Sequence, residues 1–202
     1  PEVIQASVEA TQRFGAGAGA ARLISGSLPP HQDLESALAQ FKGTEAALTF
    51  SSGYLANIGT IPALIEQGGL ILADRLCHAS LIDGCRLSAA DFRVYRHNDI
   101  GHLQSLLAKR RRARRTLIVT DGLFSMDGDL APLPELSRLA QAYEADLYID
   151  DAHGTGVMGP HGRGTAEHFG LDTQIPFQMG TLGKAFGSSG AFTIPFNLSW
   201  HP

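Results

Sequence analysis

The sequence predicts an α/β fold in which helices cover both faces of a mostly parallel central sheet. Short apolar runs alternate along the 202 residues with stretches in which apolar residues have helical spacing. The apolar runs contain few polar residues, as in strands that are buried on both faces of a sheet. They end in polar residues or glycine, and helical stretches separate them, which is typical of parallel strands.

The elements are predicted in the following order. An amphipathic helix occupies the first 14 residues, and a second one includes Asp33–Lys42. Seven apolar runs are the predicted strands: Ala46–Phe50, Leu70–Asp74, Phe92–Tyr95, Thr116–Asp121, Leu147–Asp151, Phe177–Thr181 and Ala191–Ile194. The stretches between them predict helices over Tyr54–Gln67, His78–Ala89, Ile100–Arg115 and Leu133–Tyr143. A glycine-rich turn joins the last two strands.

The composition fits a single globular domain and excludes several classes of protein. Apolar residues make up 44% and charged residues 18%, which argues against disorder. The net charge of −4 gives no general attraction to nucleic acid or anionic membranes, and no apolar run approaches the roughly 18 residues of a membrane span. Two cysteines, Cys77 and Cys85, form no disulfide framework and suit a reducing compartment. We therefore expect a cytoplasmic protein without nucleic-acid or membrane partners.

Ligands of parallel sheets bind beyond the carboxyl ends of the strands, so the residues at those ends are the first functional candidates. They are Asp74, Asp121, Asp150, Asp151 and Thr181. A further candidate is the turn Ser52–Tyr54 in TFSSGYLAN, which follows a predicted strand and begins a helix. Backbone N–H groups at such a helix N-terminus bind anions, including phosphate.

Lysine is rare in this chain, and one of its three lysines lies in an unusual place. Lys42 belongs to an amphipathic helix and Lys109 begins a basic run, whereas Lys184 lies in the apolar and glycine-rich segment GTLGKAFGSSG after a predicted strand. A desolvated lysine with a lowered pKa is a nucleophile that forms Schiff bases with carbonyl groups. The alternative is a lysine whose stem packs while its head reaches water, and the local sequence leaves both open.

The segment YIDDAHGTG places two carboxylates and a histidine after a buried strand, and three interpretations are open. Asp150, Asp151 and His153 have ligand types that bind metals. A strand-end aspartate also commonly caps the following turn. The third interpretation accounts for Lys184 as well: a pyridoxal phosphate site needs an imine-forming lysine, an aspartate at the pyridine nitrogen, and donors for the ring oxygen and phosphate.

Two other segments carry little functional signal. The glycine run Gly15–Arg22 follows a helix where a dinucleotide-binding loop would follow a strand, so we interpret it as a flexible connection. The basic run Lys109–Arg115 falls at the end of a predicted helix in an acidic chain, which favours a solvated helix end over a polyanion site.

Seven motifs, in order along the chain, resemble the α-oxoamine synthases, which are pyridoxal-phosphate enzymes with the aspartate-aminotransferase fold (fold type I). They are GAGAARLISGSLPPHQDLE, FSSGYLAN, DRLCHASLIDG, RHND, TDGLFSMDGDLAPL, DDAHGTGVMGPHGRG and GTLGKAFGSSGAF. The resemblance covers residues 1–192. The segments ARLISG, DRLCHASL and TLGKAFGSSG favour the branch of the family that joins alanine to a pimeloyl thioester in biotin synthesis.

The resemblance implies catalytic roles for four residues. Lys184 matches the lysine that holds the cofactor covalently, and Asp150 matches the aspartate at the pyridine nitrogen. His153 matches a histidine near the ring hydroxyl, and His78 matches the histidine that stacks on the ring. The implied reaction is a decarboxylating condensation of an amino acid with an acyl thioester, in which the freed Lys184 amine acts as the base.

The resemblance also implies further contacts of the cofactor. Ser125 matches a serine near a cofactor oxygen, and Thr181 matches a phosphate-binding threonine. Ser52, Gly53 and Tyr54 match the phosphate-binding turn. The family forms homodimers in which the segment near Gly17–Gly26 reaches across to the other subunit, so a homodimer is expected here.

The resemblance further implies that residues 1–202 are the large cofactor-binding domain of a longer protein. The family has an additional N-terminal segment and a C-terminal domain, which carries the arginine that holds the substrate carboxylate. The tail after Phe192 leaves the family pattern. Three alternatives remain: another member of the family, a non-catalytic remnant, and a metal hydrolase built on Asp150, Asp151 and His153, which leaves Lys184 without a role.

Overall fold

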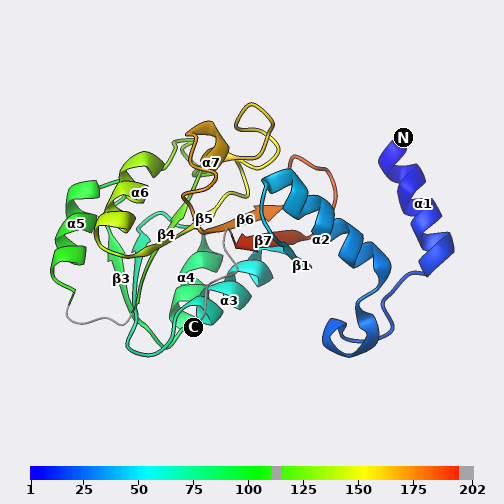
Figure 1. Cartoon of the computed structure of the whole chain (residues 1–202), viewed down its shortest axis with the longest axis horizontal. Coiled ribbons are helices and arrows are strands. Elements are labelled where there is room, and N and C mark those ends of the chain that lie inside the picture. Colours follow the sequence, from blue (N-terminus) through cyan, green and yellow to red (C-terminus); the bar gives the residue numbers. More distant parts are fainter. Residues whose placement is uncertain (111–114, 196–202) are drawn as a thin grey trace.

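The computed structural model describes residues 1–110 and 115–195, and it confirms the predicted α/β fold (Figure 1). One sheet has the strand order β1-β7-β6-β5-β4-β2-β3. Its strands are β1 (Leu48–Phe50), β2 (Leu70–Asp74), β3 (Asp91–Tyr95), β4 (Thr116–Asp121), β5 (Asp146–Asp150), β6 (Phe177–Thr181) and β7 (Ala191–Pro195). The pairs from β3 to β6 are parallel, and β7 runs antiparallel to both β6 and β1.

Helices cover both faces of this sheet because successive residues of each buried strand point to opposite faces. In β4, Val119 packs in one cluster with residues of α3 (Gly53–Leu64) and α4 (Ala79–Leu87). The neighbouring Ile118 packs in another cluster with residues of α5 (Ile100–Ala108) and α6 (Leu133–Ala142). The remaining helices are α1 (Glu2–Phe14), the π-helical turn η1 (Arg22–Gly26), α2 (Pro29–Lys42) and the short α7 (Thr165–His168).

The boundaries of several elements differ from the prediction because local caps decide where helices begin and end. The Oγ atom of Ser52 accepts a hydrogen bond from Leu55 N, so α3 begins at Gly53. Helix α5 ends at Ala108 with Lys109 as its cap, so its prediction was too long at Lys109 and Arg110. The rest of the basic run, residues 111–114, lies outside the described residues, as does the tail from residue 196.

An ion pair between η1 and α2 anchors the N-terminal segment beside β1. Helix α1 has no buried residue and lies at the end of the molecule away from β3 (Figure 1). In η1, which follows α1 in the chain, both Nη atoms of Arg22 donate to the Glu35 carboxylate of α2, at 2.6 and 2.9 Å. Thr49 N of β1 donates to the same carboxylate at 2.8 Å. These donors lower the pKa of Glu35 to about 2.

Within the described residues, the model contains no helix of sufficient length and apolar character to cross a bilayer. Cys77 and Cys85 are buried free thiols. Burial raises the pKa of both thiols, to about 12 for Cys85, so neither is a ready nucleophile.

Candidate active site

A polar cavity of about 310 Å³ lies beyond the carboxyl ends of β4, β5 and β6. It is lined by Gly53, Tyr54, His78, Ser80, Asp121, Ser125, Asp150, Ala152, His153, Met179, Thr181 and Lys184. Eight of these are among the nine residues that the motifs suggested for a cofactor. The ninth, Ser52, caps α3 directly beside the cavity. Segments from distant parts of the chain therefore converge on one place.

Two buried carboxylates form the floor of this cavity. Asp150 ends β5; its Oδ1 accepts from Ala152 N at 3.0 Å. Asp121 ends the neighbouring β4, and its Oδ2 accepts from His78 N at 2.9 Å. Burial raises the pKa of both carboxyl groups, and their mutual repulsion adds to the effect for Asp121, whose pKa is raised to about 8. The pair therefore favours a cation in the cavity.

Two histidines lie beside these carboxylates. His78 is the N-cap of α4, where its Nδ1 accepts from Ser80 N at 3.3 Å and lies 2.7 Å from Ser80 Oγ. His153 follows β5 on the other side of the cavity. Burial lowers the pKa of His153, which favours the neutral form of its imidazole.

Gly53 and Tyr54, at the N-terminus of α3, line one wall of the cavity. The first N–H groups of a helix have no partner within the helix, and the helix dipole favours negative charge there. Ser52 Oγ accepts from the N–H of Leu55, so the N–H groups of Gly53 and Tyr54 are the ones left without an intrahelical partner beside the cavity. The Tyr54 hydroxyl donates to Asp83 Oδ2 at 2.9 Å and holds this side chain toward α4.

Lys184 lies in the loop that connects the antiparallel strands β6 and β7. Two backbone hydrogen bonds close the loop, from Leu182 N to Gly190 O and from Ser188 N to Leu182 O, both at 2.9 Å. Thr181 adds a third, since its hydroxyl donates to Gly190 O at 3.1 Å. Lys184 is exposed and lines the cavity, so its head group reaches solvent, and the expected desolvation of this lysine is not present in the chain by itself.

Ser125 is an exposed residue of the turn that follows β4, and a partly buried ion-pair network fixes this turn. His97 lies between Asp74 and Asp129, with its ring nitrogens 2.9 and 2.8 Å from their carboxylates. Asn98 donates to Asp129 as well, at 2.8 Å. Asp74, one of the strand-end candidates, thus lies outside the cavity and holds the turn that carries Ser125.

Asp151 also lies outside the cavity, although it is adjacent to Asp150. It is fully buried and accepts from Thr165 N at 2.9 Å, from Thr165 Oγ1 at 2.7 Å and from Thr155 Oγ1 at 3.3 Å. These bonds close the loop between β5 and α7, which includes His153. Across the described ranges, no group of three or more His, Cys, Asp or Glu residues is arranged to hold a metal ion.

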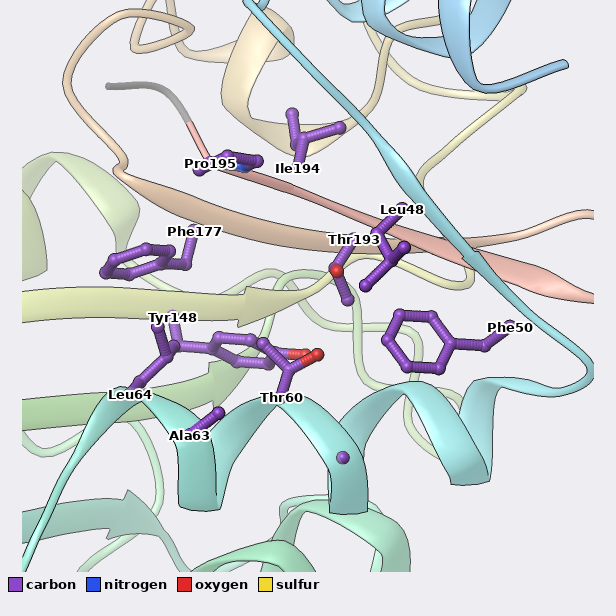
Figure 2. Close-up of a pocket in the computed structure, with 11 residues that line it drawn as sticks. Leu48, Phe50, Thr60, Ala63, Leu64, Tyr148, Phe177, Thr193, Ile194 and Pro195 are labelled. Carbon is purple, nitrogen blue, oxygen red and sulfur yellow. The ribbon is translucent and has the colours of Figure 1, made fainter. Parts of the chain in front are cut away.

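A second cavity, of about 390 Å³, lies between α3 and the strands β1, β7, β6 and β5 (Figure 2). Its lining is apolar apart from Thr60, Thr193 and Tyr148. Burial raises the pKa of Tyr148 far above its usual value, so this side chain is a poor acid or base. The acid, base and nucleophile types needed for catalysis line the polar cavity, which is therefore the candidate active site.

Sequence reasoning assigned no role to three polar residues at the site. Asp121 was a strand-end candidate to which no function was assigned, and Ser80 lies in the motif DRLCHASLIDG. Asn57 is fully buried, and its Nδ2 donates to Asp150 Oδ2 at 2.7 Å. Helical spacing could have identified Asn57, since it lies four residues after Gly53 and hence on the same face of α3.

Comparisons with known proteins show the family of the chain. The family described as aminotransferase class I and II matches residues 1–195, which extends to the end of β7. The chain is 58% identical over 192 residues to the 8-amino-7-oxononanoate synthase of Geobacter sulfurreducens and 49% identical over 193 residues to that of Alkaliphilus metalliredigens. In both cases the match covers 95% of this chain and 49% of the relative. The chain thus spans about half the length of these curated relatives.

Solved structures give the same result. A serine palmitoyltransferase from S. paucimobilis, solved with bound PLP and myriocin, superposes with a TM-score of 0.95 at 38% identity, over 98% of this chain and 50% of that one. An 8-amino-7-oxononanoate synthase from Francisella tularensis superposes with a TM-score of 0.79 at 31% identity, over 95% of this chain and 52% of that one.

Proposed function

The chain belongs to the aminotransferase class I and II family, and on this basis we propose that it is the pyridoxal-phosphate-binding large domain of an 8-amino-7-oxononanoate synthase. The whole protein would condense L-alanine with a pimeloyl thioester, releasing carbon dioxide and the thiol, in biotin biosynthesis. One observation carries the proposal: the Lys184 amine, the buried Asp150 carboxylate and the N-terminus of α3 line a single cavity.

The chemistry of the cavity fits pyridoxal phosphate. The raised pKa values of Asp121 and Asp150 favour a cation against them, and a protonated pyridine nitrogen is such a cation. The α3 N-terminus at Gly53 and Tyr54 suits a phosphate. Lys184 supplies the amine that an aldehyde requires. An acid, a phosphate donor set and an amine are thus present together.

When bound, pyridoxal phosphate supplies a ring that accepts electrons from the carbon next to the substrate amine. Asp150 would hold the proton on the ring nitrogen, and His78 would stack on the ring. His153 and Ser125 would hydrogen-bond to the ring oxygen. Lys184 Nζ would carry the cofactor in the resting protein and later take the proton from the α-carbon of the amino acid.

A second candidate function is another α-oxoamine synthase activity, such as that of serine palmitoyltransferase. The observation that favours it is the higher TM-score of the serine palmitoyltransferase structure. The sequence identity to 8-amino-7-oxononanoate synthases, up to 58% in the relatives described, favours the first candidate. A cytoplasmic location accompanies both candidates and is supported by the two free thiols.

The cofactor assignment is tested by trapping. Addition of pyridoxal phosphate to the purified chain is expected to produce a visible absorption band, and borohydride is expected to fix one cofactor per chain on Lys184. Lys184→Ala should retain no cofactor after borohydride treatment, because no amine remains at the site. The measurement is the visible spectrum followed by mass spectrometry of the labelled peptide.

Lys109→Ala provides the matched control, because Lys109 is an exposed lysine at the end of α5, far from the cavity lining. It should trap as much cofactor as the unmodified chain. A folded chain that gives no band, or an adduct located on Lys42 or Lys109, would contradict the assignment.

We also propose that the protein is a homodimer whose contact includes the N-terminal segment. Val3 and Ile4 of α1 are 66% and 71% exposed, and Leu23 and Ile24 of η1 are 99% and 82% exposed. Apolar side chains that are exposed to this extent on one segment are typical of a surface that another chain covers. This supports the expected reach of the Gly17–Gly26 segment toward a second copy.

Sedimentation equilibrium tests the dimer. The chain is expected to have twice its monomer mass of 21.5 kDa. The double variant Leu23→Asp/Ile24→Asp should sediment as a monomer, since charge at these positions opposes burial. Val94→Asp is the control, because Val94 is exposed on β3 at the opposite edge of the sheet. A dimer that survives the double variant would show that this segment is not the contact.

A further inference from the structure

We propose that Asn57 is a positioning residue that links the two cofactor-facing groups Asp150 and His78. Its amide aims the Asp150 carboxylate and, through Ser80 Oγ, strengthens the hydrogen bonding to His78 Nδ1 that the Ser80 backbone N–H begins. The inference deepens the proposed function, since the role of these groups rests on pyridoxal phosphate as the cofactor. The network itself stands on contacts that exist without the cofactor.

The direction of each hydrogen bond follows from one group that can only donate. The backbone N–H of Ser80 points at His78 Nδ1 at 3.3 Å, so Nδ1 must be an acceptor without hydrogen. Ser80 Oγ, 2.7 Å from the same nitrogen, must then be the donor of that contact. Its remaining capacity is as an acceptor, which Asn57 Nδ2 fills at 2.8 Å. The hydrogen of the neutral imidazole is therefore on Nε2.

The other hydrogen of the Asn57 amide binds Asp150. Nδ2 lies 2.7 Å from Asp150 Oδ2, so both of its hydrogens have acceptors. The Tyr148 hydroxyl donates to Asn57 Oδ1 at 2.8 Å, which prevents the amide from turning over. Tyr148, Asn57, Ser80 and Asp150 are all at most 4% exposed, so water does not compete for these bonds.

The charged groups around Asp150 show why its hydrogen bonds matter. Asp121 faces it from β4, His78 from the start of α4, and Lys184 from the loop after β6. Burial opposes ionisation of Asp150, whereas the bonds from Asn57 Nδ2 and Ala152 N favour it. Without Asn57, Oδ2 would lose the side-chain hydrogen bond that holds the carboxylate in place.

Tyr148 connects this network to the second cavity. It lines the apolar cavity between α3 and the sheet (Figure 2), and its hydroxyl reaches Asn57. The network can therefore be perturbed from either end: Tyr148→Phe removes the bond that orients the amide, and Ser80→Ala removes the bond that reaches His78.

The first test uses the cofactor-free chain. Labelling of histidine with ¹⁵N and long-range ¹H–¹⁵N correlation spectra report which ring nitrogen carries hydrogen, and His78→Gln identifies the His78 signals. The expected spectrum shows hydrogen on Nε2. Ser80→Ala and Asn57→Leu should shift the Nδ1 signal of His78, because they remove or weaken the hydrogen bond from Ser80 Oγ to Nδ1 while the Ser80 backbone N–H still selects the tautomer. Ser137→Ala should not, because Ser137 is equally buried in α6 and its Oγ has no hydrogen-bond partner among the described residues.

The second test measures the dissociation constant of pyridoxal phosphate by titration of the visible band. Asn57→Leu should weaken binding about tenfold, and Tyr148→Phe about threefold, as expected for loss of a charged and of a neutral hydrogen bond. Ser137→Ala should bind as the unmodified chain does. If Asn57→Leu fails to fold, Tyr148→Phe and Ser80→Ala carry both tests.

The outcomes separate the two proposals. Altered His78 signals in a chain that binds no cofactor would support the network and contradict the proposed function. A cofactor band with unchanged affinity and unchanged His78 signals in folded Asn57→Leu, or in Tyr148→Phe and Ser80→Ala together, would overturn the role of Asn57.

Discussion

Asp150→Asn is expected to weaken pyridoxal phosphate binding about 100-fold while it makes the cofactor-free chain more stable at pH 8. The affinity falls because an amide carries no charge to oppose a protonated ring nitrogen, and loss of a buried charged partner costs about 3 kcal/mol. The stability rises because the substitution removes one of two buried carboxylates that repel each other.

The sign of the pH dependence follows from Asp121, whose pKa is raised from 3.8 to about 8 in the folded chain. The folded state then binds more protons than the unfolded state between these two values, so stability decreases as the pH rises through this range. Asp150→Asn should lower the pKa of Asp121 and flatten this decrease. Urea unfolding at pH 5 and pH 8 measures the change of stability with pH, and cofactor titration measures the affinity for pyridoxal phosphate.

The matched control for this experiment is Asp127→Asn, because Asp127 is an exposed aspartate on the turn after β4. It should change neither the stability at pH 8 nor the pH dependence. A less stable Asp150→Asn chain, or one that binds the cofactor with full affinity, would show that the carboxylate has a different role.

Asp151→Ala is expected to destabilise the fold by about 3–5 kcal/mol, the range for removing one partner of a buried charged network. Thr165 N, Thr165 Oγ1 and Thr155 Oγ1 would lose their common acceptor. Burial lowers the pKa of Lys42, and the nearby Asp151 charge opposes this shift. Asp151→Ala would remove this main counter-charge of the buried lysine. The variant would also leave a gap, since Gly122, Gly154 and Gly164 pack closely against this carboxylate and have no side chains of their own to fill the space.

Chemical unfolding in urea at pH 7 measures this loss, with Asp127→Ala as the exposed control, expected to stay within about 0.5 kcal/mol of the unmodified chain. Cofactor trapping on Lys184 should also decrease in Asp151→Ala, because the loop that carries His153 loses its internal anchor. An Asp151→Ala chain as stable as the control would refute the structural role of this carboxylate. The two adjacent aspartates thus have opposite expected effects on stability.

The fold was predictable because its central strands are almost entirely buried. All five residues of β2 and all six of β4 are buried, and each strand is mostly apolar and ends at an aspartate. The short π-helical turn η1 and helix α7 were not predicted, because neither has a periodic apolar face. The end of α5 was misplaced because the basic run has good helix formers, whereas Arg110 turns its side chain to Thr116 and Tyr143.

The candidate site was predictable only as far as its motifs reach. The strand-end rule found Asp150 and Asp121, and the local sequence singled out Lys184 and His153, whereas the resemblance supplied His78 and the expected role of each residue. Asp150 lines the cavity and Asp151 does not, because the two side chains turn in different directions at the end of β5. No local sequence pattern encodes these directions. Asn57 was missed because its partners Asp150 and Tyr148 are 93 and 91 residues away in sequence.

The position of β1 has a consequence for the order in which the chain assembles. Its partner in the sheet is β7, and Phe50 pairs with Ala191, about 140 residues later. On a ribosome that adds about 5–20 residues per second, β1 is made about 7 to 28 seconds before the strand that binds it. The Ser52–Tyr54 turn directly follows β1, and the Lys184 loop directly precedes β7. The phosphate-binding and amine-bearing sides of the candidate site are therefore brought together in the same late step of folding.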